Sequence, residues 1–96
     1  MVNQCLGNEM IIKLSLTQRQ IEIVRQIKFR NRREKIMLDR LACCEVLAED
    51  IDELVNMLGA EFMRHGLLPS WEPNKYGLEV EGILDIVNRP RVEGWA

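Results

Sequence analysis

Apolar residues recur at helical spacing through most of the first two thirds of the chain. Reading every seventh residue from Ile23, together with the companion series that starts at Ile27, gives twelve positions, of which ten are apolar. The exceptions are Arg30 and Glu34, which stand four residues apart, where opposite charges on a helix can pair. A heptad repeat sustained over this length is typical of a supercoiled helical seam.

No glycine or proline interrupts the segment from Asn8 to Leu58, and these two residue types are the strongest breakers of regular structure. Thr17, followed three residues later by Gln20, has the capping-box pattern that begins a helix. The pattern therefore predicts a long helical region over residues 17–65.

Two arrangements of this helical region stay open. One is a continuous helix, which would be too long to bury its own seam and would need a second chain. The other is a hairpin that breaks near residues 30–33 or near residues 48–50, where Asp50 can cap a new helix with Glu53 at its third position. Helices of three or four turns are the usual length, which favours the hairpin.

An extended arm is expected before the helical region, over residues 1–16. Apolar and polar residues alternate over residues 12–16, which is a pattern typical of a strand. The sequence shows no obvious partner strand. We therefore expect the arm to pack on the helices or to pair with the same arm of a second copy.

The last third of the chain is predicted to form a loop followed by a final helix. Residues 66–74 contain two prolines and begin with a glycine, which predicts the loop. Asn74 is a suitable N-cap for a helix over residues 75–89, and Pro90 is expected to end that helix. Residues 90–96 are then a tail.

These elements predict one all-α domain over residues 1–96. It would contain two or three helices, arranged as a long helical hairpin or as a coiled-coil-like dimer, with the extended N-terminal arm in front. A homodimer is expected, because the apolar stripes are long for a chain of 96 residues.

Charge is divided unevenly along the chain. Residues 1–44 carry a net charge of +5 and residues 45–96 a net charge of −7, which leaves −2 overall. Six basic residues and one acid lie between positions 25 and 35. The basic residues are Arg25, Lys28, Arg30, Arg32, Arg33 and Lys35.

Three interpretations of this basic segment remain. It can contact nucleic-acid phosphates, it can contact an acidic surface on a protein partner, or the acidic half of the chain can neutralise it. Blocks of like charge often mark interaction surfaces, but a total charge near zero favours neutralisation.

Two aromatic residues, Trp71 and Tyr76, lie in or beside the proline-containing loop. Exposed aromatic residues anchor many protein interfaces, so both are candidate partner-binding residues. The alternative for Trp71 is that it folds back over the helices and covers the core, because large aromatic side chains are highly buried on average.

No combination of residues points to catalysis, a metal ion or a cofactor. His65 stands alone at an expected helix end, and Cys43 and Cys44 are adjacent, which does not suit a structural zinc site. No stretch is apolar enough to span a membrane. Three cysteines make a poor disulfide framework, so a reducing, cytoplasmic location is expected.

The sequence therefore predicts a small cytoplasmic protein that performs no chemistry and acts by docking on another macromolecule. A regulatory or inhibitory module that binds a protein is the first expectation. The alternative is a helical dimer that binds nucleic acid through residues 25–35.

Overall fold

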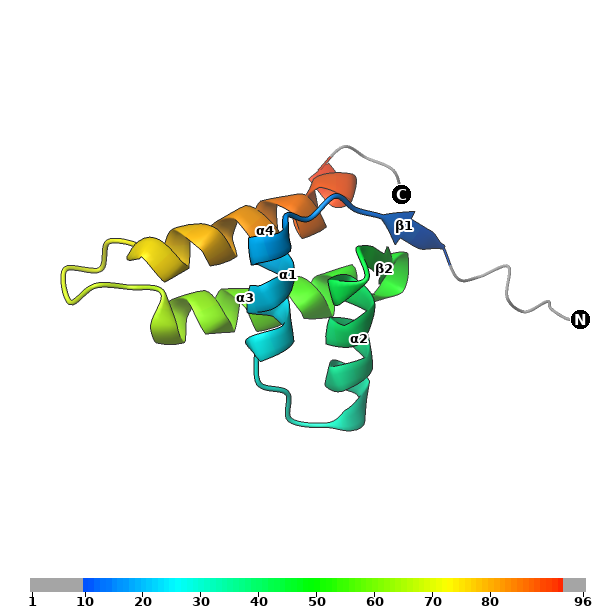
Figure 1. The fold of residues 1–96 in the computed structure, drawn as a ribbon, viewed down its shortest axis with the longest axis horizontal. Helices are drawn as coiled ribbons and strands as arrows, with labels where there is room; N and C mark the ends of the chain where they lie inside the picture. The colour runs from blue at the N-terminus through cyan, green and yellow to red at the C-terminus, as the bar shows by residue number, and fades with distance from the viewer. Residues whose placement is uncertain (1–9, 93–96) are drawn as a thin grey trace, which may run out of the picture.

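The computed structural model describes residues 10–92. Its elements are, in order, β1 (Ile11–Lys13), α1 (Gln18–Gln26), α2 (Arg32–Ala42), β2 (Glu45–Leu47), the short 3₁₀ helix η2 (Ala48–Asp50), α3 (Ile51–His65) and α4 (Lys75–Val92). The helices α3 and α4 form a hairpin, and the shorter pair α1 and α2 packs across one side of it (Figure 1). The two strands lie at the end of the hairpin away from its loop (Figure 1).

The prediction of an all-α fold, as a long helical hairpin or a coiled-coil-like dimer, is wrong. The described residues form a mixed domain of four α-helices and a two-stranded antiparallel sheet. The region expected as one helix or one hairpin over residues 17–65 is instead three α-helices with a strand between the second and third. The helical structure is interrupted near both positions predicted from the sequence, residues 30–33 and residues 48–50.

Local backbone chemistry explains the first break. The helix α1 begins at the expected capping box, in which Thr17 and Gln20 bond reciprocally, so that prediction is confirmed. It ends at Gln26 because Ile27 takes an extended conformation. The side chain of Asn31 then accepts a hydrogen bond from the backbone N–H of Glu34 at 2.9 Å and starts α2.

The second break depends on Cys44, which has a φ of 64°. This left-handed conformation ends α2 and turns the chain into β2. The strand pairs antiparallel with β1, in the register Ile11 with Leu47 and Lys13 with Glu45. The predicted extended arm therefore pairs with a strand of its own chain, with Ile12 opposite Val46, 34 residues away. Residues 1–9 of the arm lie outside the described part.

The core contains many of the apolar residues of the predicted seam. Ile23, Ile27, Met37, Leu41, Ile51 and Leu58 are all buried, together with Val80, Ile83 and Val87 of α4. Because the helices fold back on one another, the stripe is covered within one chain. The length of the stripe therefore gives no argument for a second copy.

The loop end of the α3–α4 hairpin is closed by a glycine pair and a cap. A Cβ atom on Gly77 would overlap the carbonyl oxygen of Gly66, so the two backbones meet at a distance that a side chain forbids. Asn74 caps α4 as predicted, since its Oδ1 accepts a hydrogen bond from the N–H of Gly77 at 2.7 Å. Its Nδ2 also donates to the carbonyl of His65, which ties the cap to the end of α3.

The prediction that Pro90 ends the last helix is wrong, because α4 continues to Val92. Proline removes one backbone donor from a helix without preventing the next residues from adopting helical angles. The expected tail, residues 90–96, is therefore helical at its start, and residues 93–96 lie outside the described part. Among the described residues, no helix combines the length and hydropathy needed to cross a bilayer.

Candidate functional site

The predicted basic segment lies at the turn that joins α1 to α2, not on one helix. Arg25 is in the last turn of α1, and Lys28 and Arg30 are in the connection. Arg32, Arg33 and Lys35 are in the first turns of α2. The structure divides these six side chains into a paired group and an unpaired group.

Arg30 belongs to the paired group and serves the fold. Its backbone N–H and its guanidinium both donate to the buried carboxylate of Glu34, with the shortest bond, from Nη2 to Oε2, at 2.6 Å. These bonds hold the pKa of Glu34 below its ordinary value and raise the pKa of Arg30. The expected pairing of these two residues is confirmed, but it closes a turn and does not lie within a helix.

Arg33 and Lys35 are also paired. The guanidinium of Arg33 donates to Asp50 at 3.0 Å and to Glu53 at 3.1 Å, and these contacts join α2 to the start of α3. Lys35 bonds Asp39 one helical turn further along α2. Of the six basic residues, only Arg33 is paired with the acidic half of the chain within the described part, so the predicted neutralisation by that half applies to this residue, whereas Arg30 and Lys35 pair with acids close to them in sequence.

Arg25, Lys28 and Arg32 form the unpaired group. All three are exposed, and within residues 10–92 none of them has an ion-pair partner. Phe29, with 49% of its surface exposed, lies among them in the connection. We call these four residues the basic turn. Sequence reasoning missed Phe29, although an aromatic residue inside a basic run was a visible signal.

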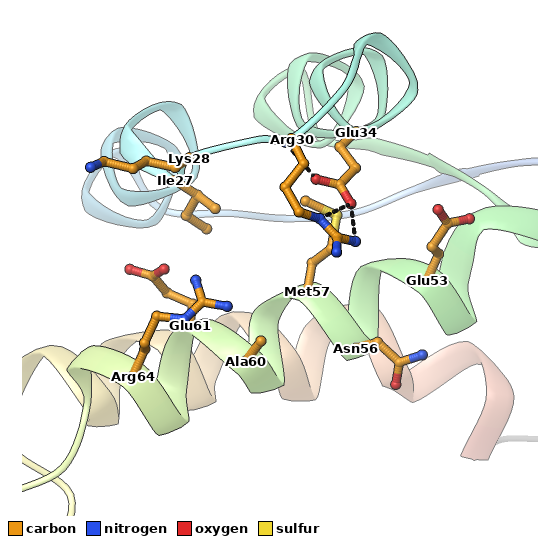
Figure 2. A pocket seen from close by; sticks show the side chains of 10 residues that line it. All are labelled: Ile27, Lys28, Arg30, Glu34, Glu53, Asn56, Met57, Ala60, Glu61 and Arg64. Carbon is orange, nitrogen blue, oxygen red and sulfur yellow. Dashed lines mark hydrogen bonds and ion pairs between the residues drawn. The ribbon is translucent and has the colours of Figure 1, made fainter.

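A cleft of about 250 Å³ opens between this connection and α3 (Figure 2). Lys28 and Arg30 line it from the connection, and Glu53, Glu61 and Arg64 line it from α3. Its lining contains both basic and acidic side chains, and the guanidinium of Arg30 is held by Glu34 at the upper rim (Figure 2). The lining contains no serine, cysteine or histidine, and its charged side chains offer ionic contacts to a ligand.

Trp71 is presented at the loop end of the hairpin, with 72% of its surface exposed. The alternative in which it covers the core is therefore wrong. Three more exposed apolar side chains belong to the same end of the molecule, namely Met63 in the last turn of α3, Leu68 in the loop and Leu78 in the first turn of α4. We call these four residues the hairpin-end patch.

Tyr76 is half-buried and makes an interaction within the chain. Its hydroxyl donates a hydrogen bond to Oε2 of Glu61 at 2.6 Å, which joins α4 to α3. Burial, and then the neighbouring carboxylate, raise the pKa of Tyr76 well above its ordinary value. The hydroxyl is therefore engaged in holding the hairpin together.

The remaining chemically versatile residues are scattered. His65 is exposed at the end of α3, while Cys43 is an exposed thiol and Cys44 a half-buried one at the end of α2. Within the described part of the chain, no cluster of three or more His, Cys, Asp or Glu side chains is placed to hold a metal ion.

Comparison with protein families, with curated proteins and with solved structures finds no match to this chain.

Proposed function

We propose that this protein is a binding module without catalytic activity, which regulates or inhibits a protein partner by docking through the hairpin-end patch. The observation that supports this proposal is the exposure of Trp71, at 72%. Tryptophan is among the residue types that most often dominate binding energy at protein interfaces. Large apolar side chains that are exposed at one end of a molecule reduce its solubility unless a partner covers them.

The turn that carries Trp71 is pre-organised, which favours binding. Backbone bonds of 2.8 Å join Leu68 to Glu72 and Trp71 to Leu68, and an isolated bridge pairs Leu67 with Pro73. Trp71 itself is held with a φ of 71°. Because the loop is already ordered, docking loses less conformational entropy than it would from a mobile loop.

Affinity capture with matched variants tests the proposal. Wild type, Trp71→Ala and Ile36→Ala are immobilised and exposed to lysate of the native cell. Ile36 is a suitable control because it is exposed by 43% on α2, outside the hairpin-end patch. We expect one or more proteins to bind wild type and Ile36→Ala but not Trp71→Ala, with equal melting temperatures for all three. Identical captured proteins from all three would contradict the proposal.

Nucleic-acid binding through the basic turn is the second candidate. It is favoured by the three exposed cations that the described residues leave unpaired and by Phe29 among them. Cations that track phosphates, combined with an aromatic ring for base stacking, are the usual elements of single-strand recognition. The net charge of −2 means that any attraction must come from this local surface.

Titration with labelled single-stranded RNA at two salt concentrations tests this candidate. We expect binding that weakens with salt and that is lost when Arg25, Lys28 and Arg32 are replaced together by alanine. Binding that is absent, or that does not change with salt, removes the candidate.

Self-association and a cytoplasmic location stay predictions. A homodimer was expected from the apolar stripe, which the fold buries within one chain. Mass measurement in solution tests the dimer. Fractionation of the native cell, followed by detection of the protein in each fraction, tests the location.

A further inference from the structure

The strand β1 has one hydrogen-bonding edge that the described residues leave open. The N–H of Leu14 donates to the carbonyl of Cys44, and the N–H of Ala48 donates to the carbonyl of Met10. In an antiparallel pair, residues alternate between those that bond the partner strand and those that face away. The backbone groups of Ile11 and Lys13 therefore point away from β2.

This strand also lines a groove whose opposite wall is the end of α4. The groove has a volume of about 520 Å³ and is formed by residues 12–15 on one side and by Ile86, Arg89 and Pro90 on the other. Figure 1 shows β1 beside the last turns of α4. Pro90 has no N–H to offer the carbonyl of Ile86, which therefore lacks its usual helical donor.

We propose that this groove binds an extended, acidic peptide segment of a protein partner, which adds to β1 as a third strand. An open strand edge recognises an extended backbone, because only a strand presents donors and acceptors at the matching spacing. The edge strand is short, so side-chain contacts in the groove must supply much of the affinity.

The charge of the groove specifies an acidic peptide. Its lining includes Lys13 and Arg89 and no carboxylate. Arg89 is exposed and has no ion-pair partner in residues 10–92, whereas Lys13 is bonded to Glu45 on the outer face of the sheet. Apolar side chains of the peptide can contact Ile12 and Ile86 in the groove, while its acids face Arg89, because Glu45 already balances the charge of Lys13.

The groove is separate from the hairpin-end patch. The sheet and the α3–α4 loop lie at opposite ends of the molecule (Figure 1). Failure of one surface to bind therefore says nothing about the other, and Trp71→Ala is expected to leave peptide binding unchanged.

The probe is a fluorescent synthetic peptide that alternates valine and glutamate, and its control has lysine in place of glutamate. The decisive variant is Lys13→Pro, which removes the N–H that faces the groove and leaves the bonds to β2 in place. Lys13→Ala is its matched control, because it loses the same side chain and keeps that N–H. We expect the glutamate peptide to bind both wild type and Lys13→Ala, with any difference between these two due to the lost side chain, and to bind Lys13→Pro about tenfold more weakly than Lys13→Ala or worse.

A second measurement does not depend on the folding of Lys13→Pro. Methylation of the peptide's own backbone nitrogens on the side that faces β1 must abolish binding to wild type, and Arg89→Ala must reduce the preference for glutamate over lysine. Equal binding of both peptides, or equal affinity of Lys13→Pro and Lys13→Ala, would overturn the proposal.

Amide hydrogen exchange and solution mass test for other occupants of the edge. In free protein, the amides of Ile11 and Lys13 must exchange much faster than the amide of Ile12, which bonds β2. Protection of all three amides would show that the edge is already covered and would overturn the proposal. A dimer that Lys13→Pro converts to a monomer would assign the edge to a second copy and would also overturn it.

Discussion

The guanidinium of Arg33 on α2 holds the carboxylate of Asp50 at the start of α3, with Nη2 3.0 Å from Oδ1. Arg40, seven residues along the same helix, approaches the other oxygen of Asp50 at 3.8 Å. Asp50 occupies the N-cap position of α3, as its place in the sequence predicts, but its side chain makes no capping bond. A residue expected to act within one helix instead joins two.

Arg33 and Arg32 are adjacent arginines for which we predict different effects on stability. Arg33→Ala is expected to lower the melting temperature, because Asp50, with 3% of its surface exposed, loses its main partner. Arg32→Ala is expected to leave the melting temperature unchanged, because no ion pair is lost among the described residues. Asp50→Ala should reduce the free energy of unfolding by about 1–3 kcal/mol. Thermal denaturation followed by circular dichroism measures all three, and equal effects of Arg32→Ala and Arg33→Ala would contradict the ion-pair assignment.

Two glycines of the α3–α4 hairpin are expected to have opposite effects when replaced by alanine. Gly77→Ala is expected to destabilise the protein by about 1–3 kcal/mol or more, since its Cβ would overlap the backbone of Gly66. Gly59→Ala is expected to stabilise the protein by about 0.5–1 kcal/mol, because it lies inside α3 and, apart from the adjacent helix backbone, no described atom lies within 4 Å of the added Cβ. Urea denaturation gives both values. A stable Gly77→Ala variant would show that the two backbones do not meet as described.

Acid should weaken the fold through Glu34. The bonds from Arg30 lower its pKa from the ordinary value of 4.5, so the folded state binds this proton less readily than the unfolded state. The stabilisation is complete above a pH of about 5 and is lost as the pH falls from 4.5 through the folded-state pKa. Arg19 lowers the pKa of Glu79 in the same way.

Melting temperatures measured across the acid range test this expectation. Glu34→Gln should have a flatter pH profile than wild type, and the combination with Glu79→Gln should have the flattest profile. An acid transition that is the same in Glu34→Gln and wild type would show that Glu34 does not contribute to it.

The left-handed backbone at Cys44 gives a fourth prediction. Its φ of 64° is costly for a residue that carries a Cβ and is free of that cost for glycine. Both Cys44→Gly and Cys44→Ala remove the thiol. The difference between their free energies of unfolding therefore reports the cost of the left-handed backbone conformation. We expect Cys44→Gly to be more stable than Cys44→Ala by about 1 kcal/mol in chemical denaturation. The reverse order would mean that the chain does not turn into β2 through this conformation.

Helix starts were predictable because each depends on residues a few positions apart. Thr17 with Gln20, and Asn74 with Gly77, make their capping bonds within three residues. Asn31 has the same local signal, with Glu34 three residues later. It was missed because arginine, glutamate and lysine are good helix formers, and their propensity concealed the cap between them.

The strand pair and the candidate surfaces were not predictable from local pattern. The partner of Ile12 is Val46, and nothing near either residue specifies the other. Arg32 and Arg33 are adjacent residues of the same type. Only Arg33 reaches Asp50, because one step along a helix turns a side chain through about 100°. Likewise, the loop sequence is compatible with a Trp71 that covers the core and with one that is exposed. The geometry of the turn places it in solvent.

By itself, then, the sequence determined where several helices begin and which residues are apolar enough to be buried. The tertiary structure decided that the apolar stripe is covered by its own chain, which of the basic residues serve the fold, and which aromatic residue is exposed. The physical reason is one of range: capping depends on neighbours within one helical turn, whereas ion pairs, strand pairing and exposure depend on which distant segments the folded chain brings together.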